Sequence, residues 1–170
     1  MRGLRSWAAL TVAGVLAAAC GGGSSDGEEV RIRPAEVRRF LEQDLNEGAQ
    51  TPVDVTGVRC PRTTTEGDTA RATCEVTIDG TAVDLAVERT GGRFARTEAV
   101  VVVPSLETFV AAQYDARLGL AVLVDCGEAE LLPVVPGETI ACTATDGQGA
   151  TLAPVVVVED LAGKVSVTLT

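Results

Sequence analysis

Residues 70–87, ARATCEVTIDGTAVDLAV, contain the pattern that decides the fold. Up to Ile78, apolar residues alternate with arginine, threonine and glutamate, which is the period of a strand with one buried and one solvated face. Asp79-Gly80 follows, and the alternation resumes and continues to Val87. An Asp-Gly pair between two alternating runs favours a tight hairpin, because both central residues need a positive φ. The stretch therefore predicts two antiparallel strands joined by a short turn.

The order of predicted elements around this hairpin occurs twice in the sequence. Apolar residues spaced i, i+3, i+4 and i+8 predict an amphipathic helix after Pro34 and another after Pro104. Each helix precedes an extended run that ends in a cysteine, then a polar or Pro/Gly loop, then a second strand that contains a cysteine. The two apolar stripes are Val37, Phe40, Leu41 and Leu45, and Leu106, Phe109, Val110 and Tyr114.

The end of each unit also repeats. Asp146-Gly147 matches Asp79-Gly80 as a hairpin signal, and a last strand follows a glycine turn in both units. We therefore expect an α+β protein with two tandem repeats, residues 30–99 and 100–170. Each repeat is predicted to pack one helix on a roughly four-stranded antiparallel sheet.

Two features distinguish the second unit. Pro154 cannot donate a ladder hydrogen bond, so its strand is expected to lie at an edge or to break there. Residues 155–158, like residues 100–103, are a run of valines and are expected to be buried on both faces. Such runs either lie where the two units meet or belong to the core of their own unit, and the sequence leaves both interpretations open.

Residues 1–19 form a basic and then apolar leader. Arg2 and Arg5 precede an uncharged stretch, residues 7–19, that is too short to span a bilayer as a stable helix. The alanines before Cys20 resemble the lipobox of bacterial lipoproteins, which implies cleavage before Cys20 and attachment of fatty acyl chains to it. Ala17 stands where a large aliphatic residue is usual. Cleavage by ordinary signal peptidase, or an uncleaved anchor, therefore stays open.

The segment after the leader, residues 20–29, is expected to be a flexible tether, because it begins with a run of glycine and serine. Together with acylation, it predicts a protein held at the outer face of the cell membrane. The formal net charge of −10 disfavours nucleic acid as a partner. Membrane contact is expected through the lipid alone, and an envelope protein or a cell-wall component is the expected type of further partner.

The number of cysteines and the absence of histidine limit the chemistry that the protein can perform. Beyond Cys20 the chain has four cysteines, and an exported protein with an even number of them is expected to form disulfides. Of the three pairings, the repeat selects Cys60–Cys74 and Cys126–Cys142. The absence of histidine from the sequence excludes Ser-His-Asp and Cys-His catalysis and imidazole metal sites.

No catalytic residue, metal site or cofactor is predicted. The acidic clusters lack the spacing of a calcium loop, so we expect them to be solvated faces. Paired carboxylates of a hydrolase stay open as an alternative, although few aromatic residues are present to stack on sugars. The clusters are Glu28-Glu29, Glu42 with Asp44 and Glu47, and Glu128 with Glu130.

The motifs around the cysteines resemble the DUF4333 family of actinobacterial secreted and lipid-anchored proteins. They are Val58-Arg59-Cys60, Gly67, residues 72–76 and Asp79-Gly80 in the first copy, and Val124-Asp125-Cys126 and residues 136–144 in the second. The resemblance implies fold, compartment and disulfides, and no activity. The doubled arrangement is also similar in architecture to beta-lactamase inhibitory proteins, which are exported tandems of two helix-plus-four-strand units.

These observations predict a non-enzymatic cell-envelope lipoprotein that presents two small disulfide-stapled domains for binding or scaffolding. An inhibitor of a secreted or envelope enzyme is the first alternative. An envelope hydrolase is the lower alternative.

Overall fold

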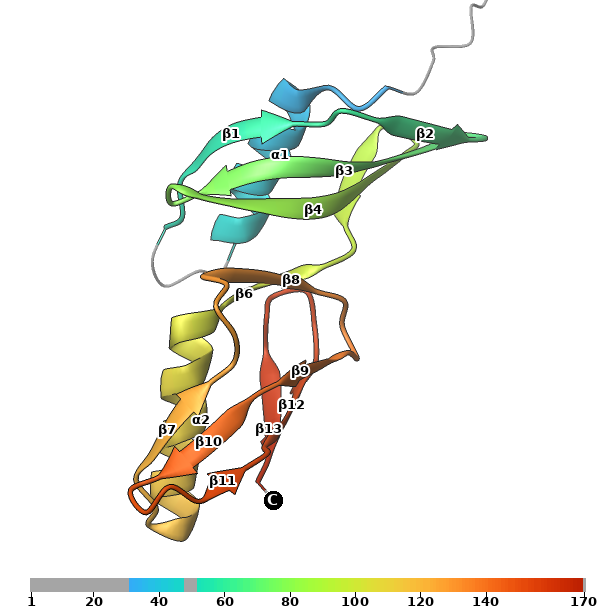
Figure 1. The fold of residues 1–170 in the computed structure, drawn as a ribbon. Coiled ribbons are helices and arrows are strands. Elements are labelled where there is room, and N and C mark those ends of the chain that lie inside the picture. Colours follow the sequence, from blue (N-terminus) through green and yellow to red (C-terminus); the bar gives the residue numbers. More distant parts are fainter. Residues whose placement is uncertain (1–30, 48–51, 170) are drawn as a thin grey trace, which may run out of the picture.

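A computed structural model describes residues 31–47 and 52–169, which form an α+β fold with two helices and antiparallel sheets (Figure 1). The predicted leader, residues 1–19, and the predicted tether, residues 20–29 with Cys20, lie outside these residues. Nothing in the fold therefore bears on the processing of the leader.

The first half of the chain forms helix α1 and one five-stranded sheet. The sheet has the order β1-β3-β4-β5, and β2 pairs with β3 beyond the end of β1. Helix α1 packs against β1, with Val37 and Leu41 fully buried, as its apolar stripe predicts. The elements are α1 (Pro34–Asn46), β1 (Val55–Arg59), β2 (Thr63–Glu66), β3 (Thr69–Ile78), β4 (Thr81–Thr90) and β5 (Arg93–Arg96).

The hairpin predicted at Asp79-Gly80 is confirmed. Strands β3 and β4 pair along their whole length, and Ile78 lies opposite Thr81. Asp79 has φ +49° and Gly80 has φ +88°, the left-handed conformations that a two-residue turn of this kind requires. The buried residues of β3 and β4 alternate with exposed ones and are Ala70, Ala72, Cys74, Val76, Ile78, Val83, Leu85 and Val87.

The prediction of a polar loop between Cys60 and Cys74 is partly wrong, because this segment contains strand β2. Its three threonines favour a strand, and Gly67 at φ +62° allows a two-residue turn back into β3. The first sheet therefore has one strand more than expected.

The second half contains helix α2 and three small sheets. Their orders are β11-β10-β7, β13-β12-β9 and β6-β8. The elements are β6 (Ala99–Val102), α2 (Val103–Leu118), β7 (Val122–Asp125), β8 (Leu131–Val134), β9 (Thr139–Ala141), β10 (Thr143–Asp146), β11 (Thr151–Leu152), β12 (Val155–Val158) and β13 (Val165–Thr168).

Three of the four stripe residues of α2 are buried, namely Leu106, Val110 and Tyr114. Phe109 is 42% exposed, so the prediction is wrong at this position. The helix buries a narrower face than its sequence indicates.

The four-stranded sheet expected in the second half is divided, and this corrects the prediction. The break predicted at Pro154 is confirmed, because β11 before it pairs with β10 whereas β12 after it pairs with β9 and β13. A second break occurs at Cys142, between β9 and β10. Two three-stranded sheets result from one expected sheet.

The hairpin predicted at Asp146-Gly147 is present and joins β10 to β11, but its turn does not have the two residues that were expected. The Asp146 N–H donates to the carbonyl of Ala150 (3.0 Å), and the Asp146 side chain accepts hydrogen bonds from the N–H groups of Gln148 and Ala150 (2.8 and 2.9 Å). The loop therefore has three residues, and Gly149 at φ +84° takes the left-handed position.

The valine runs alternate in burial instead of being buried on both faces. In β12, Val156 and Val158 are buried and Val155 is 40% exposed, so this run belongs to the second core. In β6, Val101 is part of the second core whereas Val100 packs against the first. Strand β6 therefore lies where the two halves meet, and β12 does not.

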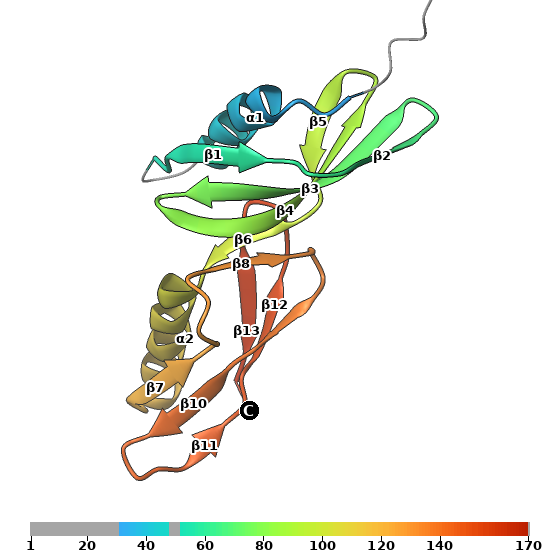
Figure 2. The ribbon, with the colours of Figure 1, turned by 45° about the horizontal axis from the view of Figure 1, so that its top comes forward.

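Buried apolar side chains form two clusters, one in each half of the chain. Strands β6 and β8 lie between them (Figure 2). Leu131 of β8 packs against the first cluster, and the Thr81 hydroxyl at the start of β4 donates to the Glu130 carboxylate (2.6 Å). The halves thus meet along β4, β6 and β8.

Tyr114 gives a stability prediction for the second core. Its side chain is fully buried, and its hydroxyl has no hydrogen-bond partner among the described residues. The same burial raises the pKa of the hydroxyl. Since an unpaired buried polar group costs free energy, we expect Tyr114→Phe to raise the free energy of unfolding by about 1 kcal/mol. Urea denaturation measures this, and a loss of stability in the variant would contradict it.

Candidate functional site

The predicted site cysteines form two disulfides, Cys60–Cys74 and Cys126–Cys142. Each disulfide joins two residues that lie opposite each other, one position beyond the last paired residues of an antiparallel strand pair. In the first sheet that neighbouring pair is Arg59 and Glu75, on β1 and β3. In the second half the neighbouring pair lies on β7 and β10. The cysteines are therefore structural cross-links, because oxidised cysteines carry no free thiol.

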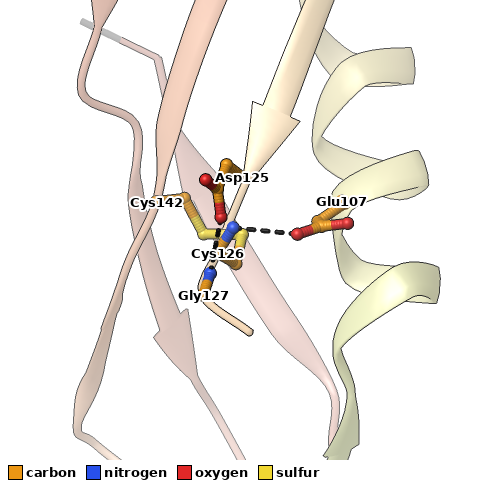
Figure 3. The surroundings of a disulfide bond; sticks show 5 residues. All are labelled: Glu107, Asp125, Cys126, Gly127 and Cys142. Carbon is orange, nitrogen blue, oxygen red and sulfur yellow. Dashed lines mark hydrogen bonds between the residues drawn. A yellow bond between two sulfur atoms is a disulfide. The ribbon is translucent and has the colours of Figure 1, made fainter. Parts of the chain in front are cut away.

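Helix α2 holds the end of β7 beside the second disulfide (Figure 3). The Cys126 N–H donates to the Glu107 carboxylate (2.9 Å), and the Gly127 N–H donates to the Asp125 side chain (2.9 Å). These hydrogen bonds satisfy backbone donors just after the strand ends. The disulfide thus lies at a corner between helix α2 and the end of strand β7.

The arrangement best suited to binding is a cavity of about 380 Å³ between the two halves, which we call the junction cavity. Its walls come from the end of α1, the β3–β4 turn, the end of β5, strands β6 and β8, and the β12–β13 turn. The described residues that line it are Asp44, Leu45, Glu47, Val53, Ile78, Asp79, Arg96, Val100, Val102, Leu131, Leu161 and Ala162.

A buried ion pair closes one side of the junction cavity. The Arg96 side chain is 8% exposed, and its Nε donates to the Asp44 carboxylate at 2.5 Å. Its Nη1 also donates to the carbonyl of Glu98 (3.0 Å). Arg96 thus ties the end of β5 to the last turn of α1, and its charge is neutralised by a partner.

Side-chain hydrogen bonds fix the rim of the junction cavity. The Asn46 side chain accepts a hydrogen bond from the Val53 N–H (2.7 Å) and donates to the Val53 carbonyl (3.0 Å), which pins the start of β1 to the end of α1. Asp79 accepts a hydrogen bond from the Asp54 N–H (2.8 Å) through its side chain. The carboxylate of Asp79 is therefore partly occupied by the backbone.

An adjoining cavity of about 280 Å³ extends the apolar surface along α2. It shares Val100, Val102 and Ala162 with the junction cavity and adds Phe109. Val102 is 47% exposed and Leu161 39% exposed, so apolar surface is open to solvent here. Exposed apolar surface beside a concave site is typical of a binding region.

A cavity of about 430 Å³ lies on the outer face of β2, β3 and β4 and has a different character. The Arg71 Nε there donates to the Glu88 carboxylate (2.8 Å), and this hydrogen bond lowers the pKa of Glu88 below its ordinary value. Both side chains are satisfied by each other across the sheet. The cavity is thus lined by a surface ion pair and offers no unpaired charge from that pair.

The acidic clusters predicted from the sequence differ in their location and in the partners of their carboxylates. Glu28-Glu29 lies outside the described residues. Asp44 is paired with Arg96 and Glu47 lines the junction cavity, so the cluster on α1 is not simply a solvated face. Glu130 accepts the hydrogen bond from Thr81 at the meeting of the two halves.

The structure bears on other kinds of site only within residues 31–47 and 52–169. No group of three or more Asp, Glu, Cys or His side chains that could hold a metal ion occurs in that part of the chain. Its two helices also lack the length and apolar character needed to cross a bilayer. Comparisons with protein-family models, with curated proteins and with solved structures return no match to this chain.

Proposed function

We propose that this chain is a non-enzymatic cell-envelope lipoprotein, held at the outer face of the cell membrane through Cys20, that presents two disulfide-stapled modules for binding or scaffolding. The observation that carries the proposal is the pair of disulfides, because such cross-links persist in oxidising compartments outside the cytoplasm. The lipobox-like sequence that ends in Cys20 supports the same compartment independently.

The two modules of the proposal are residues 30–99 and 100–170. Their relatedness is supported by the order of elements. In each half a helix precedes a strand that is followed at once by a cysteine, and the disulfide of that cysteine closes the end of the strand's antiparallel pairing, β1 with β3 and β7 with β10. We further propose that both modules belong to the DUF4333 type, which implies a compartment and a fold and leaves the partner open.

A binding role is supported by the junction cavity and the apolar surface beside it. Of its three carboxylates, Asp44 is paired with Arg96 and Asp79 is hydrogen-bonded to the backbone of Asp54. These bonds give two of the three acidic groups structural tasks, which favours binding over hydrolysis. An envelope protein or a cell-wall component is the proposed class of partner.

Cys20→Ser tests the anchor. We expect the parent chain to label with palmitate and to sediment with membranes, and the variant to do neither, because a single thiol carries the lipid. Ser24→Ala is the matched control and should behave as the parent chain does. A Cys20→Ser variant that still labels and sediments would contradict the anchor, and a parent chain that is released and unlabelled would indicate ordinary signal peptidase.

The binding role is tested by photo-cross-linking on intact cells. A photoreactive residue at Leu161, which lines the junction cavity, is expected to give one recurrent adduct. The same residue at the exposed Thr168 of β13 is the control and should not give that adduct. Identical adducts at both positions, or none at Leu161, would count against a binding surface at the junction.

A further inference from the structure

We propose that the junction cavity binds a small amphipathic cation, with its apolar body among the aliphatic side chains and its protonated amine at the carboxylates of the rim. This inference rests on the proposed binding role and goes beyond the proposed partner, because it assigns a small-molecule ligand to the junction cavity.

The aliphatic walls of the junction cavity indicate that the ligand has an apolar body. Eight of the lining residues are aliphatic, and they come from both halves of the chain: Leu45, Val53, Ile78, Val100, Val102, Leu131, Leu161 and Ala162. Val102 and Leu161 expose apolar surface that a bound ligand would cover, which supplies the driving force. The volume of about 380 Å³ lies at the lower end of the range for small-molecule sites.

The acidic side chains at the rim of the junction cavity indicate that the ligand is positively charged. Asp44, Glu47 and Asp79 supply three carboxylates against the single guanidinium of Arg96. That guanidinium is 8% exposed and already bonded to Asp44 and to a backbone carbonyl, so it is poorly placed to receive an anion. The formal net charge of −10 adds a long-range attraction for cations.

Glu47 is the carboxylate best placed to meet the amine. Glu47 follows the last turn of α1 and is exposed to solvent. It makes no ion pair with any residue that the structure describes. Asp44 and Asp79 already have partners, so they contribute to the field more than to direct contact. A fatty acid would bring its own carboxylate against these three groups and is disfavoured.

The test is isothermal titration calorimetry with three probes of equal chain length: octylammonium, octan-1-ol and octanoate. The protein is the chain with Cys20→Ser, so that no acyl group competes for the cavity. We expect saturable binding of one octylammonium per chain, with a Kd about tenfold below that of octan-1-ol. Octanoate is expected to bind more weakly than the alcohol.

Two variants separate the charge from the apolar walls. Glu47→Gln is expected to weaken octylammonium about fivefold and to leave octan-1-ol unchanged, since a charged hydrogen bond is lost. Glu42→Gln, at an exposed position of the adjoining helix α1 that does not line the cavity, is the matched control and should change neither. Leu161→Ala, in an exposed turn, should weaken both probes alike because it removes apolar contact.

The proposal is overturned if octanoate binds as tightly as octylammonium, if no probe shows saturable binding, or if Glu47→Gln and Glu42→Gln behave alike. A recurrent protein adduct from Leu161 together with no probe binding would assign the cavity to a protein interface; it would overturn this inference and leave the binding role intact. Because the calorimetry uses an unacylated chain, its outcome is independent of whether the anchor at Cys20 is correct.

Discussion

Replacing Cys60 and Cys74 together by alanine is expected to lower the free energy of unfolding by about 3 kcal/mol. The two cysteines are 14 positions apart in the sequence, and in the chain-entropy account the disulfide restricts the unfolded chain over the loop between them. Strand β1 pairs only with β3 among the described strands, so the disulfide also closes the end of that pairing. Cys74 is fully buried, and its loss removes packing as well.

Urea denaturation of the oxidised proteins measures this effect. The Cys126→Ala, Cys142→Ala double variant should lose a similar amount, because its cysteines are 16 positions apart and close a loop only slightly longer than the first. A reductant should bring the parent chain below either variant, and each variant should lose its remaining disulfide in the same treatment. Unfolding midpoints that match the parent in both double variants would show that the cross-links are dispensable.

Arg96→Ala is expected to cost about 3 kcal/mol, the second large effect. The substitution leaves the Asp44 carboxylate, whose side chain is 33% exposed, without its charged partner, and it removes a donor from the Glu98 carbonyl. Removing one partner of an ion pair with a buried guanidinium is costly because the remaining carboxylate is only partly solvated. Urea denaturation again provides the measurement.

Arg71→Ala is the matched comparison for Arg96→Ala. Arg71 also donates to a carboxylate, that of Glu88, but its side chain is 59% exposed. Exposed ion pairs contribute little, so we expect a loss below about 1 kcal/mol. Replacing both partners of the buried pair, Arg96→Met with Asp44→Leu, should recover much of the loss. Equal losses for Arg71→Ala and Arg96→Ala would contradict the role of burial.

Local signals predicted those parts of the fold that local chemistry decides. The alternation up to Ile78 and the Asp79-Gly80 turn are reproduced residue by residue, because both halves of that signal lie in one short stretch. Asp146-Gly147 carries the same dipeptide and folds differently. There the Asp146 side chain binds two N–H groups further on, and Gly149 offers a second left-handed position. The dipeptide alone does not decide between the two turns.

The site was less accessible to sequence reasoning. The junction cavity is lined by Asp44, Val102 and Leu161, which are far apart in the sequence. No local sequence motif therefore predicts it. One signal was present for Arg96. Strand alternation places it on the same face as Phe94, which packs against the first core, so a charge on an apolar face could have been expected there.

Intact-mass measurement of the chain extracted from membranes tests the central claim most directly. The account predicts a first residue of Cys20 that carries acyl chains, and a polypeptide four hydrogen atoms lighter than its reduced form, two for each disulfide. A chain that begins elsewhere without acyl groups, or that keeps its cysteines reduced, would contradict it.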